Sequence, residues 1–255
     1  MIKIVTGFGK NENILNAVGD INNNIKDLEV TVVESEKQLF ESIISNKVDA
    51  VVRGSLPSSL IMKMIRKHYN KPINRATYIK EERDNSYYEF LLAPVGIDEC
   101  DSVDEKVNLA IQASQFLKTM NLKPKIAILS FGREDDSGRN DFIDNSLKSA
   151  EKLYNELINV FKNNDFISGD VEIKNYFILL EKAIKEKNNL ILPPNGAVGN
   201  IIFRSLVLLN YWNSYGAIAL GINDVFIDTS RDQSVESYLR SLKLAYQIAK
   251  SKAIK

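Results

Sequence analysis

The loop from Asp228 to Ser234 contains residue types that could bind an anion and polarise it. A hydroxyl, a guanidinium and carboxylates follow a short apolar run. Arg231 could neutralise a phosphate or a developing oxyanion, and Ser230 could donate a hydrogen bond to it. The same segment also fits the start of a helix, with Asp232 or Ser234 as the N-cap. The two interpretations can hold together.

A second loop, Gly132–Asn140, combines two glycines with two arginines directly after an apolar run. Gly132 and Gly138 would let backbone amides approach a ligand. Arg133 and Arg139 could each bind phosphate oxygens through the forked guanidinium. Three acidic residues lie among the arginines, as they would in a solvated surface loop. The spacing alone leaves both interpretations open.

The third loop, Asn195–Asn200, lies between a short apolar run and a longer one. Small residues at the start of a helix can form a phosphate-binding turn, because free backbone amides and the helix dipole favour an anion. The residues that would form it here are Asn195, Gly196, Gly199 and Asn200. The loop lacks a Walker lysine and a full GxGxxG, so it does not specify a nucleotide. A tight turn from strand to helix explains the glycines as well as a ligand does.

Other reactive side chains are scarce. The 255 residues include one histidine, His68, and one cysteine, Cys100. One cysteine excludes a disulfide and a thiolate zinc cluster within the chain, and one histidine excludes a multi-histidine metal site. Acidic neighbours raise the pKa of the Cys100 thiol, which disfavours a nucleophilic role. His68 is expected on a helix surface, without a role.

Charge and hydropathy exclude further classes. Lys and Arg number 33 and so do Asp and Glu, so there is no global basic field for nucleic acid. No run approaches the roughly 20 apolar residues that span a bilayer. The opening MIKIVTGFG lacks the order of a signal peptide. We therefore expect a cytoplasmic chain with neither a nucleic-acid nor a membrane partner.

Short apolar runs alternate with helical patterns and so predict how these loops are positioned. The predicted strands are residues 1–9, 28–35, 48–54, 87–96, 126–131, 169–173, 190–192, 216–221 and 225–227. The predicted helices are residues 14–25, 36–45, 55–69, 103–120, 142–162, 177–187, 201–213 and a C-terminal stretch to about 248. This alternation favours an α/β fold with a parallel sheet covered on both faces. The three loops all follow predicted strands, where such sheets bind ligands.

The segment LPPNGAVGNIIFRSL, followed by GAIALGINDVFIDTSRDQSVESY, resembles the closing region of phosphate acetyl- and butyryltransferases. That family carries a Gly-Asn opening a helix, a glycine-bounded strand, and an Asn-Asp-Leu-Ser-Arg-Gly segment followed by Ser-Val-Glu-Asp. Upstream, Asp49–Gly54 is similar to its Asp-x-x-x-x-Gly segment. Lys123–Phe131 is similar to its Pro-Lys-Val-Ala-Leu-Leu-Ser-Phe strand.

Within that superfamily, the short chain and the loop GREDDSGRND resemble a narrower archaeal group. This is the putative methyltransferase Mtx subunit X family, also called methanogenesis marker protein four. The sequence itself supports no methyl transfer. The first strand leads into Gly7 and Gly9 without an S-adenosylmethionine loop, and the corrinoid Asp-x-His-x-x-Gly pattern is absent around His68.

The resemblance implies two three-layer α/β/α domains with a cleft, like those of isocitrate and isopropylmalate dehydrogenases. Residues 1–85 with 222–255 would form the first domain and 86–221 the second, with a hinge near 83–86. Phosphotransacetylases move an acyl group between coenzyme A and phosphate. By resemblance, the catalytic candidates are Asp228, Ser230, Arg231 and Asp232. The implied substrate-binding or phosphate-binding residues are Gly54, Ser130, Gly132, Arg133, Gly138, Arg139, Asn195, Gly196, Gly199 and Asn200.

One departure from the family pattern bears on catalysis. The family's acidic residue in Ser-Val-Glu-Asp corresponds here to Ser237, so the base that would deprotonate a thiol is missing. Asp232, where the family has Gly, could replace it or could repel an anionic substrate. The main hypothesis is a transferase acting on an acyl phosphate or coenzyme-like anion, labelled a methyltransferase subunit. The alternative is a non-catalytic ligand-binding or regulatory subunit.

The expected partners follow from the same resemblance. They are a small anionic phosphorylated ligand, other methyltransferase subunits and a second copy of the chain in a homodimer. No metal and no required cofactor are expected. Coenzyme A or a related anionic coenzyme would act as a substrate.

Overall fold

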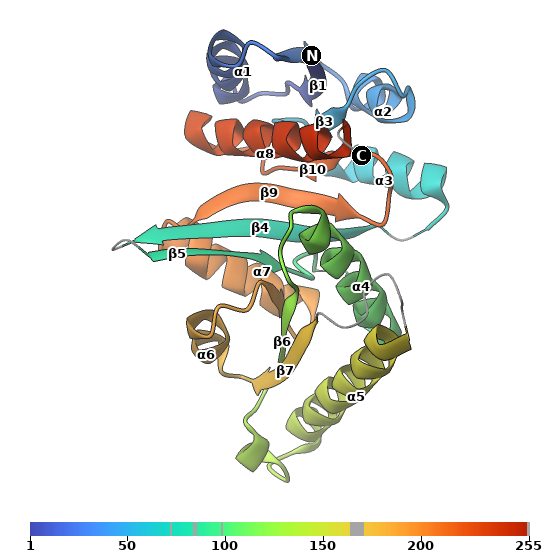
Figure 1. The fold of residues 1–255 in the computed structure, drawn as a ribbon, viewed down its shortest axis with the longest axis vertical. Helices are drawn as coiled ribbons and strands as arrows, with labels where there is room; N and C mark the ends of the chain where they lie inside the picture. The colour runs from blue at the N-terminus through green and yellow to red at the C-terminus, as the bar shows by residue number, and fades with distance from the viewer. Residues whose placement is uncertain (72, 84–85, 98, 164–170, 254–255) are drawn as a thin grey trace. The chain divides into compact units, whose positions relative to one another are not determined.

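A computed structural model describes residues 1–71, 73–83, 86–97, 99–163 and 171–253 (Figure 1). These residues group into two compact units, which we call the first unit (Met1–Arg75 and Asn213–Lys255) and the second unit (Ala76–Trp212). The predicted hinge at 83–86 and the predicted strand at 169–173 lie partly outside the described residues. Within the described part, no helix is both long and apolar enough to cross a membrane.

The first unit alternates strands with helices along most of its length. Its elements are β1 (Ile2–Gly7), α1 (Asn13–Asn24), β2 (Leu28–Val33), α2 (Glu36–Ile44), β3 (Ala50–Val52), α3 (Ser58–Tyr69), β9 (Asn213–Leu220), β10 (Phe226–Asp228) and α8 (Val235–Ala253). Its strands follow the order β2-β1-β3-β10-β9. The first four run parallel, whereas β9 pairs antiparallel with β10.

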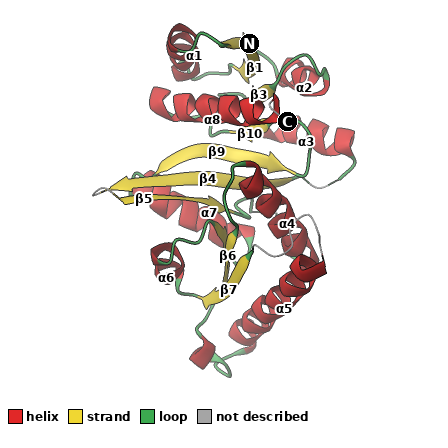
Figure 2. Ribbon diagram, in the orientation of Figure 1, coloured by secondary structure: helices red, strands yellow, loops and turns green. Residues whose placement is uncertain are grey.

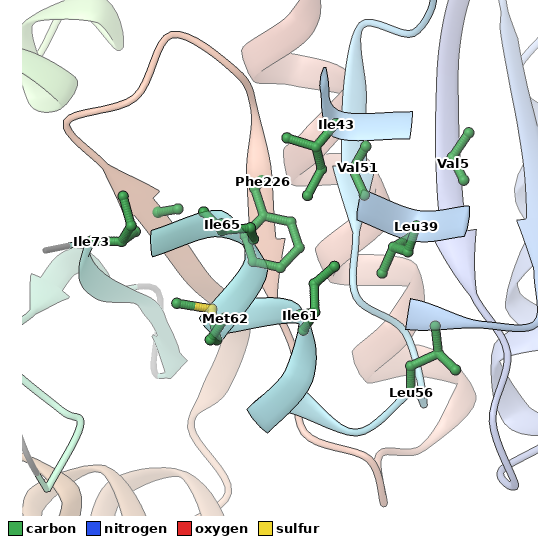
Figure 3. Packing of buried hydrophobic residues seen from close by; sticks show 11 residues of the cluster. Val5, Leu39, Ile43, Val51, Leu56, Ile61, Met62, Ile65, Ile73 and Phe226 are labelled. Atoms are coloured by element: carbon green, nitrogen blue, oxygen red, sulfur yellow. The ribbon is translucent and has the colours of Figure 1, made fainter. Parts of the chain in front are cut away.

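The core of the first unit lies between its strands and helices α2 and α3. Figure 3 shows Phe226 of β10 beside Ile61 and Ile65 of α3, and all three side chains are fully buried. α8 packs against α1 and against the strands. Because consecutive residues of β1, including Ile4 and Val5, are buried, both faces of this strand are covered, as in a three-layer α/β/α arrangement.

The second unit has a mixed sheet (Figure 2). Its elements are β4 (Asn74–Arg83, which begins at the unit boundary), β5 (Ser86–Leu92), α4 (Val103–Thr119), β6 (Lys125–Leu129), the 3-10 turn η1 (Glu134–Asp136), α5 (Asp141–Asn163), β7 (Glu172–Phe177), α6 (Leu180–Lys185), β8 (Leu190–Leu192), α7 (Gly196–Phe203) and the π-helical turn η2 (Arg204–Leu209). The strand order is β4-β5-β8-β6-β7. β4 and β5 are antiparallel, and the other pairs are parallel.

Helices flank this second sheet on two sides. α4 and α5 pack together beside β8, β6 and β7, while α6 lies across β7 from them (Figure 1). α4 begins with a capping box in which the Ser102 hydroxyl accepts from the Glu105 amide and the Glu105 carboxylate accepts from the Ser102 amide. The core contains Phe90, Ala127 and Ile191, one from each of the central strands.

Four details differ from the sequence prediction. β4 was not predicted, because Asn74–Arg83 ends in charged residues and is defined by its pairing with β5. The predicted parallel sheet is antiparallel at β4–β5 and at β9–β10. α7 begins at Gly196, so Asn195–Asn200 is largely helix rather than loop. The predicted domain ranges put all of β9 in the second domain, whereas its residues group with the first unit through β10 and α8.

Candidate functional site

In the first unit, the segments that follow β1, β3 and β10 are joined by hydrogen bonds. The Thr229 hydroxyl donates to the carbonyl of Gly54 at 2.8 Å, and the Gly9 amide donates to the Ser55 hydroxyl at 2.8 Å. Gly54 has φ +65°, and a Cβ there would lie 2.0 Å from the Gly7 carbonyl oxygen. Gly54 is therefore required by the close approach of two backbones.

Asp228, predicted as a catalytic acid, is buried at the end of β10. Its carboxylate accepts from Nε of Arg53 and, at 2.7 Å, from Nη1 of Arg75. Arg53 also donates to the carbonyl of Leu56. Asp228 therefore links β10 to β3 and fixes two arginines. Its catalytic role stays a prediction.

Ser230 and Arg231 have exposed side chains on a fixed backbone. The Tyr238 hydroxyl donates to the carbonyls of Ser230 and Arg231 at 3.2 and 2.7 Å, and Asn11 Nδ2 donates to the carbonyl of Arg231 at 3.1 Å. Burial raises the pKa of Tyr238 to about 12, so its hydroxyl stays a donor at neutral pH. The hydroxyl of Ser230 and the guanidinium of Arg231 have no hydrogen-bond partner among the described residues. The backbone of both residues is thus fixed, while their side chains are open to a ligand.

The start of α8 confirms the capping interpretation for one residue. The Ser234 hydroxyl accepts from the Ser237 amide at 3.3 Å. Asp232 precedes the N-terminus of α8 and is exposed. The Ser237 hydroxyl accepts from Nη2 of Arg240 at 2.6 Å. Arg240 also donates from Nε to the carbonyl of Ser214 at 3.1 Å. Ser237, which the sequence resemblance aligned with an acidic residue, is thus a hydroxyl engaged by an arginine, and that correspondence stays a prediction.

In the second unit, the loop after β6 is ordered by its own acids. Nη2 of Arg139 pairs with Asp136 at 2.8 Å, and the Arg133 amide donates to the same carboxylate at 2.8 Å. The Gly138 amide donates to Asp144 at 2.7 Å. Both arginine side chains are exposed. A phosphate at Arg139 would compete with Asp136, which favours the surface-loop interpretation for that arginine.

Ser130 and Gly132 lie just beyond β6 and are buried. The Ser130 hydroxyl donates to the Gly132 carbonyl at 3.0 Å. A Cβ on Gly132 would lie 2.8 Å from a methyl of Ile143. These contacts join the end of β6 to α5.

The glycines of Asn195–Asn200 have a packing role. A Cβ on Gly196 would lie 1.7 Å from the Gly96 carbonyl oxygen, and a Cβ on Gly199 would lie 1.9 Å from that of Pro94. Asn195 caps α7 by accepting from the Val198 amide at 2.9 Å. Asn200 Nδ2 donates to the carbonyl of Val95 at 3.2 Å. The structure thus supplies the turn-and-packing explanation, and a ligand at this turn stays a prediction.

The predicted residues fall into two groups. Gly54, Asp228, Ser230, Arg231 and Asp232 belong to the first unit. Ser130, Gly132, Arg133, Gly138, Arg139, Asn195, Gly196, Gly199 and Asn200 belong to the second, after β6 and β8. Joint action of the two groups in one cleft stays a prediction.

Sequence reasoning missed three charged residues that the fold buries or half-buries. Arg53 directly follows the buried strand residues Ala50–Val52, and this position in the sequence could have indicated that it is buried. Arg75 carried no signal of its own. Lys106 shares a helical face with Leu109 and Ala113 of α4, at the i, i+3 and i+7 spacing of an apolar stripe. It lines a cavity that also touches Asn195.

Cys100 is buried, and burial, followed by the charge of Glu99, raises its thiol pKa to about 12. The predicted direction is right, but burial rather than the acids is the larger cause. A thiolate at Cys100 is therefore disfavoured at neutral pH.

Comparison with known proteins finds relatives that are named as methyltransferases. It is 35% identical over 250 residues to an uncharacterized methyltransferase of Methanocaldococcus jannaschii, covering 95% of this chain and 96% of the relative. It is 34% identical over 198 residues to the putative methyltransferase mtx subunit X of Methanosarcina barkeri, covering 78% and 69%. The chain belongs to the Mtx subunit X family. No protein-family model matches it.

Solved structures show the fold of this Mtx subunit X chain. A branched-chain phosphotransacylase from Enterococcus faecalis superposes with a TM-score of 0.71 at 16% identity, covering 98% of this chain and 99% of the other. A 4-hydroxythreonine-4-phosphate dehydrogenase from Klebsiella pneumoniae superposes with a TM-score of 0.60 at 12% identity, covering 96% and 90%. The predicted α/β class with phosphotransacetylase-like and dehydrogenase-like folds is confirmed.

Proposed function

We propose that this Mtx subunit X protein is a transferase subunit that binds a small phosphorylated or coenzyme-like anion through Ser230 and Arg231. One observation carries the proposal. Three hydrogen bonds fix the backbone carbonyls of these two residues, while their side chains stay exposed and open. A fixed backbone lowers the entropy lost when the guanidinium orders around an anion. A forked guanidinium then binds two oxygens of one phosphate.

The chemistry that we propose is acyl or methyl transfer to or from this anion. Methyl transfer is in keeping with the names of the relatives from Methanocaldococcus jannaschii and Methanosarcina barkeri, and acyl transfer with that of a phosphate acetyltransferase 28% identical over 155 residues. Acyl transfer would place negative charge on the reacting oxygens, where Arg231 and the Ser230 hydroxyl stabilise it. Asp232, exposed one residue further on, is the carboxylate available as a base. Coenzyme A or a related anionic coenzyme would be the second substrate.

A non-catalytic ligand-binding subunit is the second candidate, and one observation favours it. Ser237 takes the place of the family's acid and accepts from Arg240 at 2.6 Å. A hydroxyl in that environment is a poor base for a thiol. In this case Arg231 would still bind the anion, but no acyl transfer would follow.

Acyl transfer between acetyl phosphate and coenzyme A tests the proposal with Arg231→Ala beside wild type. The control is Arg204→Ala, which removes an exposed arginine of η2. We expect transfer by wild type and control, and a loss of at least about 100-fold in Arg231→Ala, as for removal of one oxyanion donor. Full activity in Arg231→Ala would refute the assigned residue. Binding of acetyl phosphate without turnover in wild type would support the non-catalytic candidate.

Methyl transfer is tested separately. The protein would be combined with its partner methyltransferase subunits, a methylated corrinoid or pterin donor and coenzyme M. Transfer that disappears in Arg231→Ala and survives in Arg204→Ala would support a methyltransferase subunit. Absence of transfer in the complete mixture would remove methyl transfer from the proposal.

We also propose a homodimer formed through the second unit. Large apolar side chains are exposed along α7 and η2 and at the second residue after η2: Ile201, Leu208, Leu209 and Tyr211. Clusters of this kind commonly mark interaction surfaces. Light scattering should give twice the monomer mass for wild type and the monomer mass for Leu209→Asp. Equal masses for the two proteins would contradict this interface.

A further inference from the structure

A cavity of about 300 Å³ lies within the second unit, between α4, α5 and the segments that follow β6 and β8. Its volume equals that of about ten waters at ~30 Å³ each, the lower end for small-molecule sites. Apolar lining comes from β6, α5 and Pro193–Pro194, and polar lining includes Lys106, Ser146, Ser149 and Asn195. A small ligand with both an apolar and a polar part therefore fits this cavity.

Lys106 is the unusual residue of this lining. The residue is 7% exposed, and its ammonium group has neither a hydrogen-bond acceptor nor an ion-pair partner among the described residues. Most buried charges in proteins are paired, because an unpaired one loses its hydration without compensation. Burial accordingly lowers the pKa of Lys106. A largely buried lysine without a partner that borders an open cavity is a candidate ligand-binding residue.

The other polar groups of the cavity also present donors. The Ser146 hydroxyl accepts from the Phe131 amide at 2.9 Å, so its own proton remains free to be donated. Asn195 uses its carbonyl oxygen to cap α7, which leaves its amide hydrogens available. Ser149 has no hydrogen-bond partner among the described residues. Hydroxyls and an amide around one ammonium group favour an anionic ligand.

The net charge of the lining limits the charge of that ligand. Asp101 also borders the cavity, but its side chain is exposed and its charge is screened by water. The carboxylate of Glu105, also exposed, is a second negative charge near Lys106. One positive charge with two exposed, water-screened negative charges nearby suits a monoanion better than a dianion. The apolar lining, with the Phe131 and Phe142 ring centroids 4.6 Å apart at one side, suits a short aliphatic group.

We propose that this cavity binds a small monocarboxylate with a short aliphatic tail, and that the carboxylate pairs with Lys106. The tail lies against the apolar residues of β6 and α5, and Ser146 and Asn195 complete the donor set. This site is formed by the second unit alone and does not depend on Arg231.

Isothermal titration calorimetry with butyrate tests the assignment. Butyramide is the matched neutral probe, and inorganic phosphate is the probe without a tail. Lys106→Met removes the charge at similar length, and Lys148→Met on the exposed side of α5 is the matched control. We expect butyrate to bind wild type and Lys148→Met, and to bind Lys106→Met at least about tenfold more weakly, the factor that one charge-assisted hydrogen bond contributes. Butyramide and phosphate should bind wild type at least about tenfold more weakly than butyrate.

Three results would overturn the proposal. They are equal affinity of wild type and Lys106→Met for butyrate, equal affinity of wild type for butyrate and butyramide, and no heat of binding for butyrate up to about 100 mM. Loss of butyrate binding in Arg231→Ala with retention in Lys106→Met would move the anion to the first unit and overturn it too. Circular dichroism checks folding, and Lys106→Gln replaces Lys106→Met if the latter unfolds.

Discussion

Asp228→Asn removes the negative charge that Arg53 pairs with and leaves the shape of the side chain nearly unchanged. The side chains of Arg53 and Asp228 are 7% and 9% exposed, so water cannot replace the lost partner. Removing one member of a buried ion pair costs about 3–5 kcal/mol, because the other charge stays buried and unpaired. Arg75, whose side chain is 16% exposed, also loses its ion pair with Asp228 and adds to this cost.

Urea unfolding followed by circular dichroism measures this cost. We expect the free energy of unfolding of the first unit to fall by about 3–5 kcal/mol in Asp228→Asn. The single tryptophan, Trp212, lies in the second unit and reports on that unit separately. Arg53→Met should cost a similar amount, for the same reason. The double variant should cost clearly less than the sum of the two, with a coupling of about 2 kcal/mol.

Two results would refute this reasoning. A loss below about 1 kcal/mol in Asp228→Asn would mean that the pair behaves like a solvated surface pair. Additive losses in the double variant would mean that the two side chains do not stabilise each other. Either result would free Asp228 from its structural role and leave the catalytic interpretation as the better one.

Two further predictions concern single side chains of the second unit. Gly199→Ala places a Cβ 1.9 Å from the Pro94 carbonyl oxygen and should lower the free energy of unfolding by more than the about 1–3 kcal/mol usual for overpacking. The control, Gly19→Ala on α1 of the first unit, has no atom within 4 Å of the new Cβ and should raise the free energy of unfolding by about 0.5–1 kcal/mol. Equal effects of the two substitutions in denaturant unfolding would contradict the packing role of Gly199. Burial lowers the pKa of Lys106, although the nearby carboxylates of Asp101 and Glu105 act in the opposite direction. The unfolded chain therefore binds the extra proton between that lowered pKa and about 10.4, so stability should rise with pH across this window. The rise should be seen in wild type and Lys148→Met and should be smaller in Lys106→Met, and parallel curves would contradict the desolvation of Lys106.

The sequence predicted the features that depend on local pattern. Ser234 was one of two predicted caps, with Asp232, because a polar side chain before a helical pattern can satisfy an amide of the first turn, and the structure selects Ser234. β6 and the loop after it were recognised because an apolar run ends in glycine and charged residues. Ser230 and Arg231 were proposed from their residue types and from the family resemblance, and the structure adds that Tyr238 fixes their backbone. Their role stays a prediction.

Features that depend on distant contacts were not predictable. The need for Gly196 and Gly199 is set by Gly96 and Pro94, about a hundred residues earlier in the chain. β4 is recognised by its partner strand rather than by its own composition. Lys106 has the helical spacing of a core position, but only the packing of α5 and of the residues after β8 around it creates the cavity.

Binding of acetyl phosphate, measured by isothermal titration calorimetry, tests the central claim most directly. Wild type and Arg204→Ala should bind it with equal affinity. Arg231→Ala should bind at least about tenfold more weakly, because a charge-assisted hydrogen bond to an oxyanion contributes about that factor. Equal affinity in all three proteins would contradict the assignment of Arg231 as the residue that binds the anion.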